Sequence, residues 1–194
     1  MISHRLGHFL DKPLFPVARV ISIHPNFLTL AGFLITTIAA LVIPFNLLAG
    51  GLLILSGGIF DILDGVVARV NGRTSRFGAF LDSLLDRYSD AFILLSIAWY
   101  LASGGDHTGS FLSLGTMLGA LLVSYARARA EGLGIDNREG LMERPERIIM
   151  LIFALLTGWL LPVLWIMFVL THVTVIQRAY AVWRSGRDNS GFKV

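Results

Sequence analysis

Residues 48–70 read LAGGLLILSGGIFDILDGVVARV, and residues 77–101 read FGAFLDSLLDRYSDAFILLSIAWYL. Each stretch is long and apolar enough for a helix that crosses a membrane, which needs about 20 mostly apolar residues. Together they nevertheless carry five acidic residues: Asp61, Asp64, Asp82, Asp86 and Asp90. A carboxylate at membrane depth costs about 2.5–3.5 kcal/mol on insertion scales, so its presence there indicates a functional site. These two stretches therefore predict both the fold and the place of the chemistry.

The rest of the chain has the same apolar character. Of its 194 residues, 55% are hydrophobic and 15% are charged, and the mean hydropathy is +0.70. Soluble domains carry about 25% charged residues. Further apolar stretches occupy residues 27–45, 111–130, 147–161 and 163–182, and Pro162 marks the break between the last two. We expect an all-α integral membrane protein with six transmembrane helices.

The basic residues indicate how such a bundle is oriented. The lysines and arginines, 16 in all, lie on or near one side of the six-span topology. This is the positive-inside pattern, so we expect both termini and the acidic site to face the cytoplasm at the cell membrane. Residues 1–24 form an amphipathic segment expected to be a helix on the membrane surface, and residues 185–194 form a cytoplasmic tail. Anionic lipid explains the net charge of +3 better than nucleic acid does.

The spacing of the aspartates predicts a metal site. Asp61 and Asp64 are three residues apart, and Asp82, Asp86 and Asp90 follow one another at intervals of four, so each set lies on one helix face. Two facing helices would then gather carboxylate oxygens near their cytoplasmic ends. Hard divalent cations such as Mg²⁺ or Mn²⁺ prefer that ligand set, commonly as a pair of ions. Asp90 is expected to support this site indirectly, for example by pairing with Arg87.

Small residues accompany the acidic ones. Gly65 follows Asp64, Ala68 lies one turn on, and Gly78 precedes Asp82 by one turn. Glycine inside a helix costs about 1 kcal/mol relative to alanine, so close approach of a helix or of a phosphate is indicated. Arg69 offers a planar fork for phosphate oxygens. Close helix packing alone is the alternative explanation for the small residues.

The string Asp61-x2-Asp64-Gly65-x2-Ala68-Arg69-x8-Gly78-x3-Asp82-x3-Asp86 resembles the signature of the CDP-alcohol phosphotransferase family. The resemblance covers nearly the whole chain and implies one six-helix domain over residues 25–184. It implies transfer of a phosphatidyl group, or its ether-lipid equivalent, from a CDP-lipid to an alcohol with release of CMP, in a homodimer.

The resemblance also implies residue roles. Asp61, Asp64, Asp82 and Asp86 would bind the metals, and Asp86 would also be the general base. The implied contacts of the CDP-lipid are Asp61, Asp64, Gly65, Ala68, Arg69, Gly78, Asp82 and Thr29. Thr29 belongs to a Pro25-Asn26-x2-Thr29 start of the first span, for which the alternative is a plain helix start capped by Asn26.

Arginines from three other stretches suggest an acceptor that itself carries a phosphate. Arginines near the membrane boundary are costly unless anions match them, and Arg127, Arg147 and Arg178 lie at the ends of three predicted spans. The runs SYARARAEGLG (124–134) and ERPER (143–147) resemble the inositol-phosphate branch of the family. This resemblance implies that the acceptor phosphate is contacted by Ser124, Arg127, Arg144, Arg147 and Arg178. Glycerol 3-phosphate is the rival acceptor, and pairing with Glu131, Glu143 and Glu146 is the alternative role for these arginines.

A cation transporter is the alternative of another class, because acidic residues in membranes also mark ion pathways. Transporters often show internal repeats and place charges near the midplane. Here the acidic residues lie in the cytoplasmic halves of the spans, and no repeat is visible. The pattern therefore favours an enzyme.

Overall fold

The computed structural model describes residues 24–137 and 140–188, and this part of the chain contains six helices and no strand. The helices are α2 (Pro25–Val42), α3 (Leu47–Val70), α4 (Arg76–Ser103), α5 (His107–Gly132), α6 (Arg144–Thr157) and α7 (Leu160–Asp188). The all-α prediction is confirmed. The predicted surface helix (1–24, except His24) and residues 189–194 of the predicted tail lie outside the described residues.

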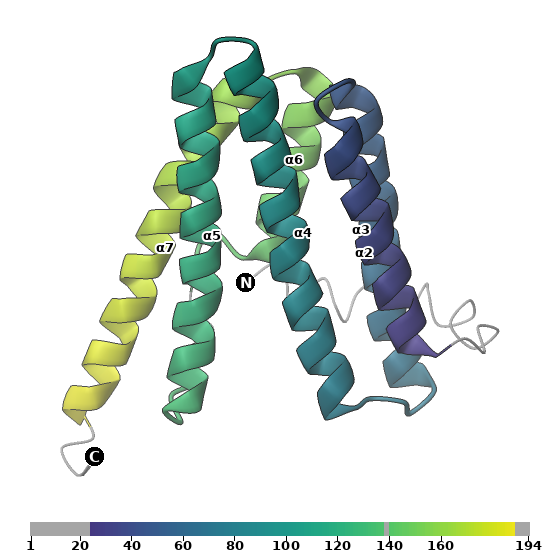
Figure 1. Cartoon of the computed structure of the whole chain (residues 1–194). Coiled ribbons are helices and arrows are strands. Elements are labelled where there is room, and N and C mark those ends of the chain that lie inside the picture. Colours follow the sequence, from purple (N-terminus) through teal and green to yellow (C-terminus); the bar gives the residue numbers. More distant parts are fainter. Residues whose placement is uncertain (1–23, 138–139, 189–194) are drawn as a thin grey trace.

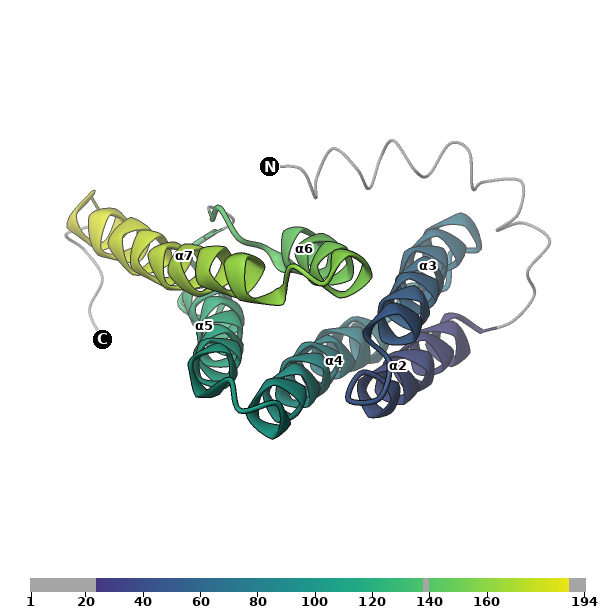
Figure 2. The ribbon, with the colours of Figure 1, turned by 90° about the horizontal axis from the view of Figure 1, so that it is seen from above.

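The helices run alternately up and down (Figure 1) and pack as a closed ring. Seen from above, α2 and α3 lie at one side of the molecule, and α4 and α5 lie across from α6 and α7 (Figure 2). Contacts follow the order α2, α3, α6, α7, α5, α4 and back to α2. The two aspartate-bearing helices, α3 and α4, are thus joined through α2 on one side and through α6, α7 and α5 on the other.

Side-chain caps fix where the helices begin. Asn46, Ser75 and Asp106 accept hydrogen bonds from the backbone N–H groups of the third residues after them, at 2.8–3.0 Å. These bonds satisfy N–H groups that a helix start leaves without partners. The alternative of Asn26 as the cap of the first span is wrong. His24 caps α2, and Pro25 takes the first helical position, where no N–H is needed.

Four helices are long and apolar enough to cross a membrane: α2, α3, α5 and α7. Charged residues lower the hydropathy of α4, although it has 28 residues. Helix α6 has only 14 residues, which corresponds to about 21 Å, against a hydrocarbon core of about 30 Å. The chain is a multi-pass membrane protein, and the number of six spans stays a prediction.

The short length of α6 reflects how the chain enters it. After α5 the backbone folds back along α7, where the Asn137 side chain donates to the carbonyl of Arg178 at 3.0 Å. The N–H of Met142 donates to the Thr174 hydroxyl at 3.1 Å. Inside a membrane protein, irregular backbone is tolerated when other protein groups satisfy its hydrogen bonds. The segment delivers Arg144 into the bundle, which the sequence did not predict.

The break between α6 and α7 lies at Gly158, and the prediction of a break at Pro162 is wrong. Gly158 has a φ of +76°, a left-handed conformation that ends a helix and favours glycine. Pro162 lies within the first turn of α7, where its missing N–H leaves no helical bond unmade.

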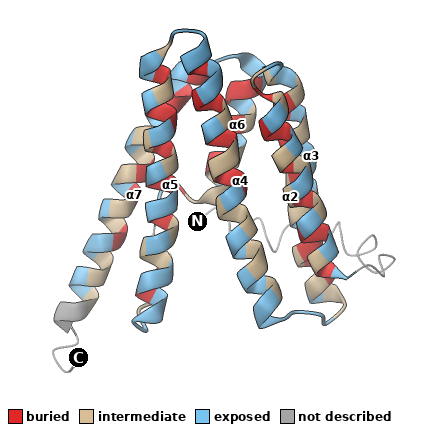
Figure 3. Ribbon diagram, in the orientation of Figure 1, coloured by how far each residue is buried: buried red, intermediate tan, exposed pale blue. Residues whose placement is uncertain are grey.

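The apolar core lies mainly in one half of the bundle (Figure 3). Its largest members include Ile43, Ile97, Leu155 and Met167, all at 2% exposure or less. In α4 the buried residues begin at Ser89, so the first turns, which carry Asp82 and Asp86, are not enclosed. The core thus holds the helices together at one end and leaves a polar opening at the other.

Candidate active site

Three carboxylates converge where α3 faces α4. Asp61 and Asp64 on α3 and Asp82 on α4 each offer an oxygen within 4.8 Å of the others. We call these three residues the carboxylate cluster. Asp64 is only 6% exposed, and its Oδ2 atom has no hydrogen-bond partner among the described residues. Converging hard oxygens, one of them buried without a partner, fit a divalent cation.

Thr29 on α2 borders this cluster. Its hydroxyl donates to the carbonyl of Pro25 at 3.2 Å and lies near the Asp64 carboxylate. The side chain is buried and therefore has little freedom to turn away. Of the two explanations offered for the start of the first span, proximity to the acidic site is the one that this geometry favours.

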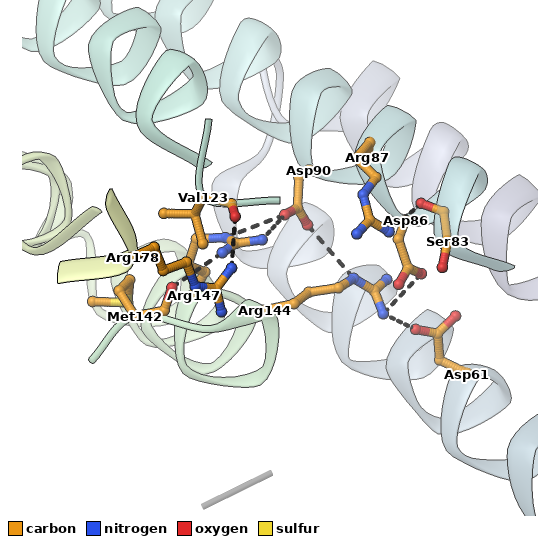
Figure 4. A network of polar contacts seen from close by, with 10 residues as sticks. All are labelled: Asp61, Ser83, Asp86, Arg87, Asp90, Val123, Met142, Arg144, Arg147 and Arg178. Atoms are coloured by element: carbon orange, nitrogen blue, oxygen red, sulfur yellow. Dashed lines mark hydrogen bonds and ion pairs between the residues drawn. The ribbon is translucent and has the colours of Figure 1, made fainter. Parts of the chain in front are cut away.

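Arg144 lies among the predicted metal ligands (Figure 4). Its Nη1 atom hydrogen-bonds the Asp61 carboxylate and lies 2.9 Å from Oδ1 of Asp86. Its Nε atom lies 3.7 Å from Oδ1 of Asp90. Asp86 itself is one turn beyond Asp82 and outside the carboxylate cluster. One arginine, predicted only as an acceptor contact, therefore joins both aspartate-bearing helices.

Asp90 and Arg147 form a buried ion pair. Oδ2 of Asp90 accepts from Nη2 and Nε of Arg147 at 2.7 and 3.2 Å, and Nη1 of Arg147 donates to the carbonyl of Met142 at 3.3 Å. Both side chains are at most 7% exposed. The expected pairing of Asp90 with Arg87 is wrong, because Arg87 donates to the carbonyl of Ser83 on its own helix. The expected indirect role of Asp90 fits its contacts with Arg147 and Arg144.

The remaining predicted acceptor residues border the same region. Arg178 is 2% exposed, donates to the carbonyl of Val123 at 2.6 Å and lies 3.5 Å from Glu143. Arg127 pairs with Glu131 at 2.9 Å on the partly exposed face of α5. Pairing with glutamates, the alternative from the sequence, is thus present at both arginines.

Two pockets adjoin this network. The arginine pocket, of about 700 Å³, is lined by Asp82, Asp86 and Asp90 and by all five predicted acceptor residues: Ser124, Arg127, Arg144, Arg147 and Arg178. The α3–α6 groove, of about 470 Å³, is lined by Asp61, Gly65 and Arg69 and otherwise mostly by apolar side chains. Arg144 and Pro145 line both pockets.

The small residues near the cluster have different surroundings. At Gly65, an added Cβ would lie 3.2 Å from Nη1 of Arg69, inside the α3–α6 groove. At Gly78, a Cβ would lie 3.0 Å from the side-chain oxygen of Asn26, so the close packing of α4 on α2 that the sequence offered as an alternative is present at this glycine. Ala68 is half-buried on α3 and lines neither pocket.

In this bundle of apolar helices, the carboxylate cluster lies where an apolar groove and a cationic pocket adjoin. The model of the CDP-alcohol phosphatidyltransferase family matches residues 22–177. The chain belongs to this family, which confirms the predicted enzyme class. The transporter alternative has no support in this match.

Relatives and solved structures agree with the family. The chain is 38% identical to the archaetidylinositol phosphate synthase of Methanothermobacter thermautotrophicus, over 92% of this chain and 91% of that protein. It is 37% identical to the phosphatidylinositol phosphate synthase of Mycobacteroides abscessus, over 81% and 76%. The Mycobacterium tuberculosis phosphatidylinositol phosphate synthase with CDP-DAG bound superimposes with a TM-score of 0.79 at 29% identity, covering 92% and 94%.

Proposed function

We propose that the chain transfers the lipid phosphate group of a CDP-lipid to a hydroxyl of inositol phosphate and releases CMP. The observation that carries the proposal is the meeting of two pockets at the aspartates: an apolar groove suited to a lipid and a cationic pocket suited to a phosphorylated alcohol. Relatives named for inositol phosphate products support the choice of acceptor.

Asp61, Asp64, Asp82 and Asp86 are the proposed ligands of Mg²⁺ or Mn²⁺, with two ions as the expected number. The convergence of three of these side chains supports the assignment, as does a related M. tuberculosis structure that contains manganese and citrate. Bound divalent cations neutralise diphosphate oxygens and the charge that develops on them during transfer.

The donor lipid is proposed to lie along α3. Asp61, Gly65 and Arg69 border the α3–α6 groove, whose apolar residues, including Ile148 and Ile152, suit an acyl or isoprenoid chain. Asp64, Ala68, Gly78, Asp82 and Thr29 complete the proposed CDP-lipid contacts. The guanidinium of Arg69 can hold a diphosphate oxygen, because it presents two parallel N–H donors.

Asp86 is the proposed general base, since its carboxylate lines the arginine pocket where the acceptor would bind. The acceptor oxygen attacks the phosphorus that carries the lipid, and its proton passes to Asp86. The bond between that phosphorus and the oxygen leading to CMP breaks, so CMP leaves with the bonding electrons. Holding the hydroxyl and the phosphorus in line supplies much of the rate.

Ser124, Arg127, Arg144, Arg147 and Arg178 are the proposed contacts of the acceptor phosphate, and their shared pocket supports this role. Glycerol 3-phosphate would suit the same cationic lining. We place the site on the cytoplasmic side of the cell membrane, because the basic loops and both chain ends fall on the same side of the predicted topology. A homodimer is part of the proposal through the family resemblance.

The test is CMP release by the purified full chain in lipid vesicles with Mn²⁺ and either diacyl or ether-linked CDP-lipid. Separate reactions receive inositol phosphate, glycerol 3-phosphate, inositol or serine. We expect release that depends on the acceptor and is fastest with inositol phosphate. A preference for glycerol 3-phosphate would overturn the inositol assignment alone, and no release with any acceptor would overturn the proposed function.

A further inference from the structure

Arg144 differs from the other arginines of the site in how it is held. Arg147 is almost fully buried and makes three hydrogen bonds that fix its guanidinium. The Arg144 side chain is 28% exposed, and its Nε atom makes no hydrogen bond among the described residues. Ion pairs with Asp61 and Asp86 are its main attachments. Such a side chain can leave when a stronger cation competes for the same carboxylates.

A divalent cation at the carboxylate cluster would be such a competitor. Asp61 is a member of the cluster and also the hydrogen-bond partner of Arg144. The carboxylate of Asp61 would have to serve a guanidinium and a metal ion at once. Two cations held about 4 Å apart repel each other strongly where the surroundings are less polar than water. Binding of the metal and the present position of Arg144 therefore oppose each other.

The arginine pocket beside Arg144 offers space into which its side chain can move. Arg144 lines the arginine pocket as well as the α3–α6 groove, as Pro145 does, so both residues lie where the two pockets adjoin. The acceptor hydroxyl has to reach the donor phosphorus across this boundary. Asp86 also has to be free of the guanidinium before its carboxylate can take a proton. Both requirements are met if Arg144 moves towards the arginine pocket.

We propose that Arg144 is a displaceable counter-cation. It neutralises the aspartates until divalent cations bind, and the cations then drive it into the arginine pocket, where it contacts the acceptor phosphate. The proposal rests on the proposed function. Loading of the metal site thereby separates Asp86 from the guanidinium, opens the boundary between the two pockets and completes the acceptor site. Metal binding precedes productive acceptor binding in this scheme.

The experiment measures Mn²⁺ binding to the detergent-purified full chain without substrates, by the electron paramagnetic resonance signal of free Mn²⁺. Arg144→Gln removes the competing charge, and we expect its Mn²⁺ dissociation constant to fall at least about tenfold. Arg144→Lys keeps the charge but loses the planar fork, so a smaller fall is expected. Arg129→Gln is the matched control, because Arg129 is exposed and lines neither pocket, and its Mn²⁺ affinity should not change.

A second measurement, of acceptor binding, should show weaker binding where the first shows tighter metal binding. At saturating Mn²⁺, the KM for inositol phosphate should rise about tenfold or more in Arg144→Gln, because one phosphate contact is lost. A purely structural role would not tighten metal binding while weakening acceptor binding. If Arg144→Gln does not fold, Arg144→Lys decides the question by the same two quantities.

Unchanged or weaker Mn²⁺ binding in both Arg144 variants would overturn the displacement, and so would an unchanged KM for the acceptor. Acceptor-dependent CMP release by the unmutated chain would still support the proposed function in that case. Absence of both Mn²⁺ binding and CMP release in the unmutated chain would overturn the two proposals together.

Discussion

The carboxylate cluster and the Asp90–Arg147 pair lie within the same network, yet their charges are balanced differently. In the pair, one aspartate meets one arginine, and three hydrogen bonds hold the guanidinium in a buried place. In the cluster, three carboxylates approach one another within 4.8 Å, and a buried oxygen of Asp64 has no hydrogen-bond partner among the described residues. Arg144 reaches the cluster through Asp61 alone among its three members.

This difference separates a structural site from a binding site. Removing one partner of a buried ion pair is strongly destabilising, because the other charge is then left buried without compensation. The pair therefore stabilises the packing of α6 against α4. Like charges brought together without enough cations raise the energy of the folded chain until a ligand binds. Removing a charge from the pair should thus lower the free energy of unfolding, whereas removing one from the cluster should lower the rate of CMP release.

The largest expected effect is on activity at the cluster. Asp64→Asn removes one ligand charge and should lower CMP release by about 10³-fold or more. Its thermal midpoint in a chelator should stay the same or rise, because repulsion from Asp61 and Asp82 is relieved. The control is Asp106→Asn, which changes the same charge at the cap of α5 and keeps a capping side chain. A destabilised but active Asp64→Asn would contradict the assignment.

The next effect concerns stability at the pair. Asp90→Asn leaves the buried guanidinium of Arg147 without its counter-charge, which should cost about 2–3 kcal/mol of unfolding free energy. For a chain of this size the thermal midpoint should fall by roughly 5–10 °C. Thermal unfolding in detergent, with and without Mn²⁺, measures this. An unchanged midpoint would show that the pair does not hold the helices together.

The smallest effect concerns the exposed rim of the arginine pocket. Arg127→Ala should raise the KM for the phosphorylated acceptor by about tenfold, because one charge-assisted hydrogen bond is lost and solvent screens the site in part. The KM for the CDP-lipid should hardly change. Steady-state kinetics with each substrate varied in turn measures both. Equal changes in the two KM values would show that Arg127 does not contact the acceptor specifically.

Most of the fold could be predicted from local signals. The starts of α3 and α5 follow Asn46 and Asp106, whose capping side chains mark helix starts in the sequence itself. The aspartate spacing placed Asp61, Asp64 and Asp82 on facing helices, as the structure has them. Periodicity and caps act within a few residues, so both can be read directly from the sequence.

The rest depends on contacts between distant residues. Asn137 meets Arg178 across 41 residues, and Asp90 meets Arg147 across 57. Local patterns carry no information about such partners, so the fold-back before α6 and the partner of Asp90 were missed. Arg144 was predicted to touch an acceptor, but its place between Asp61 and Asp86 depends on that same fold-back.

Under the proposed function, the carboxylate cluster works only with divalent cations. The most direct measurement is CMP release from CDP-lipid and inositol phosphate by the full chain treated with a chelator and then supplied with Mn²⁺ or Mg²⁺. We predict no release in the chelator, full recovery with either added ion in excess, and no recovery in Asp82→Asn. Release at an undiminished rate in the chelator would show that the carboxylate cluster does not need a divalent cation.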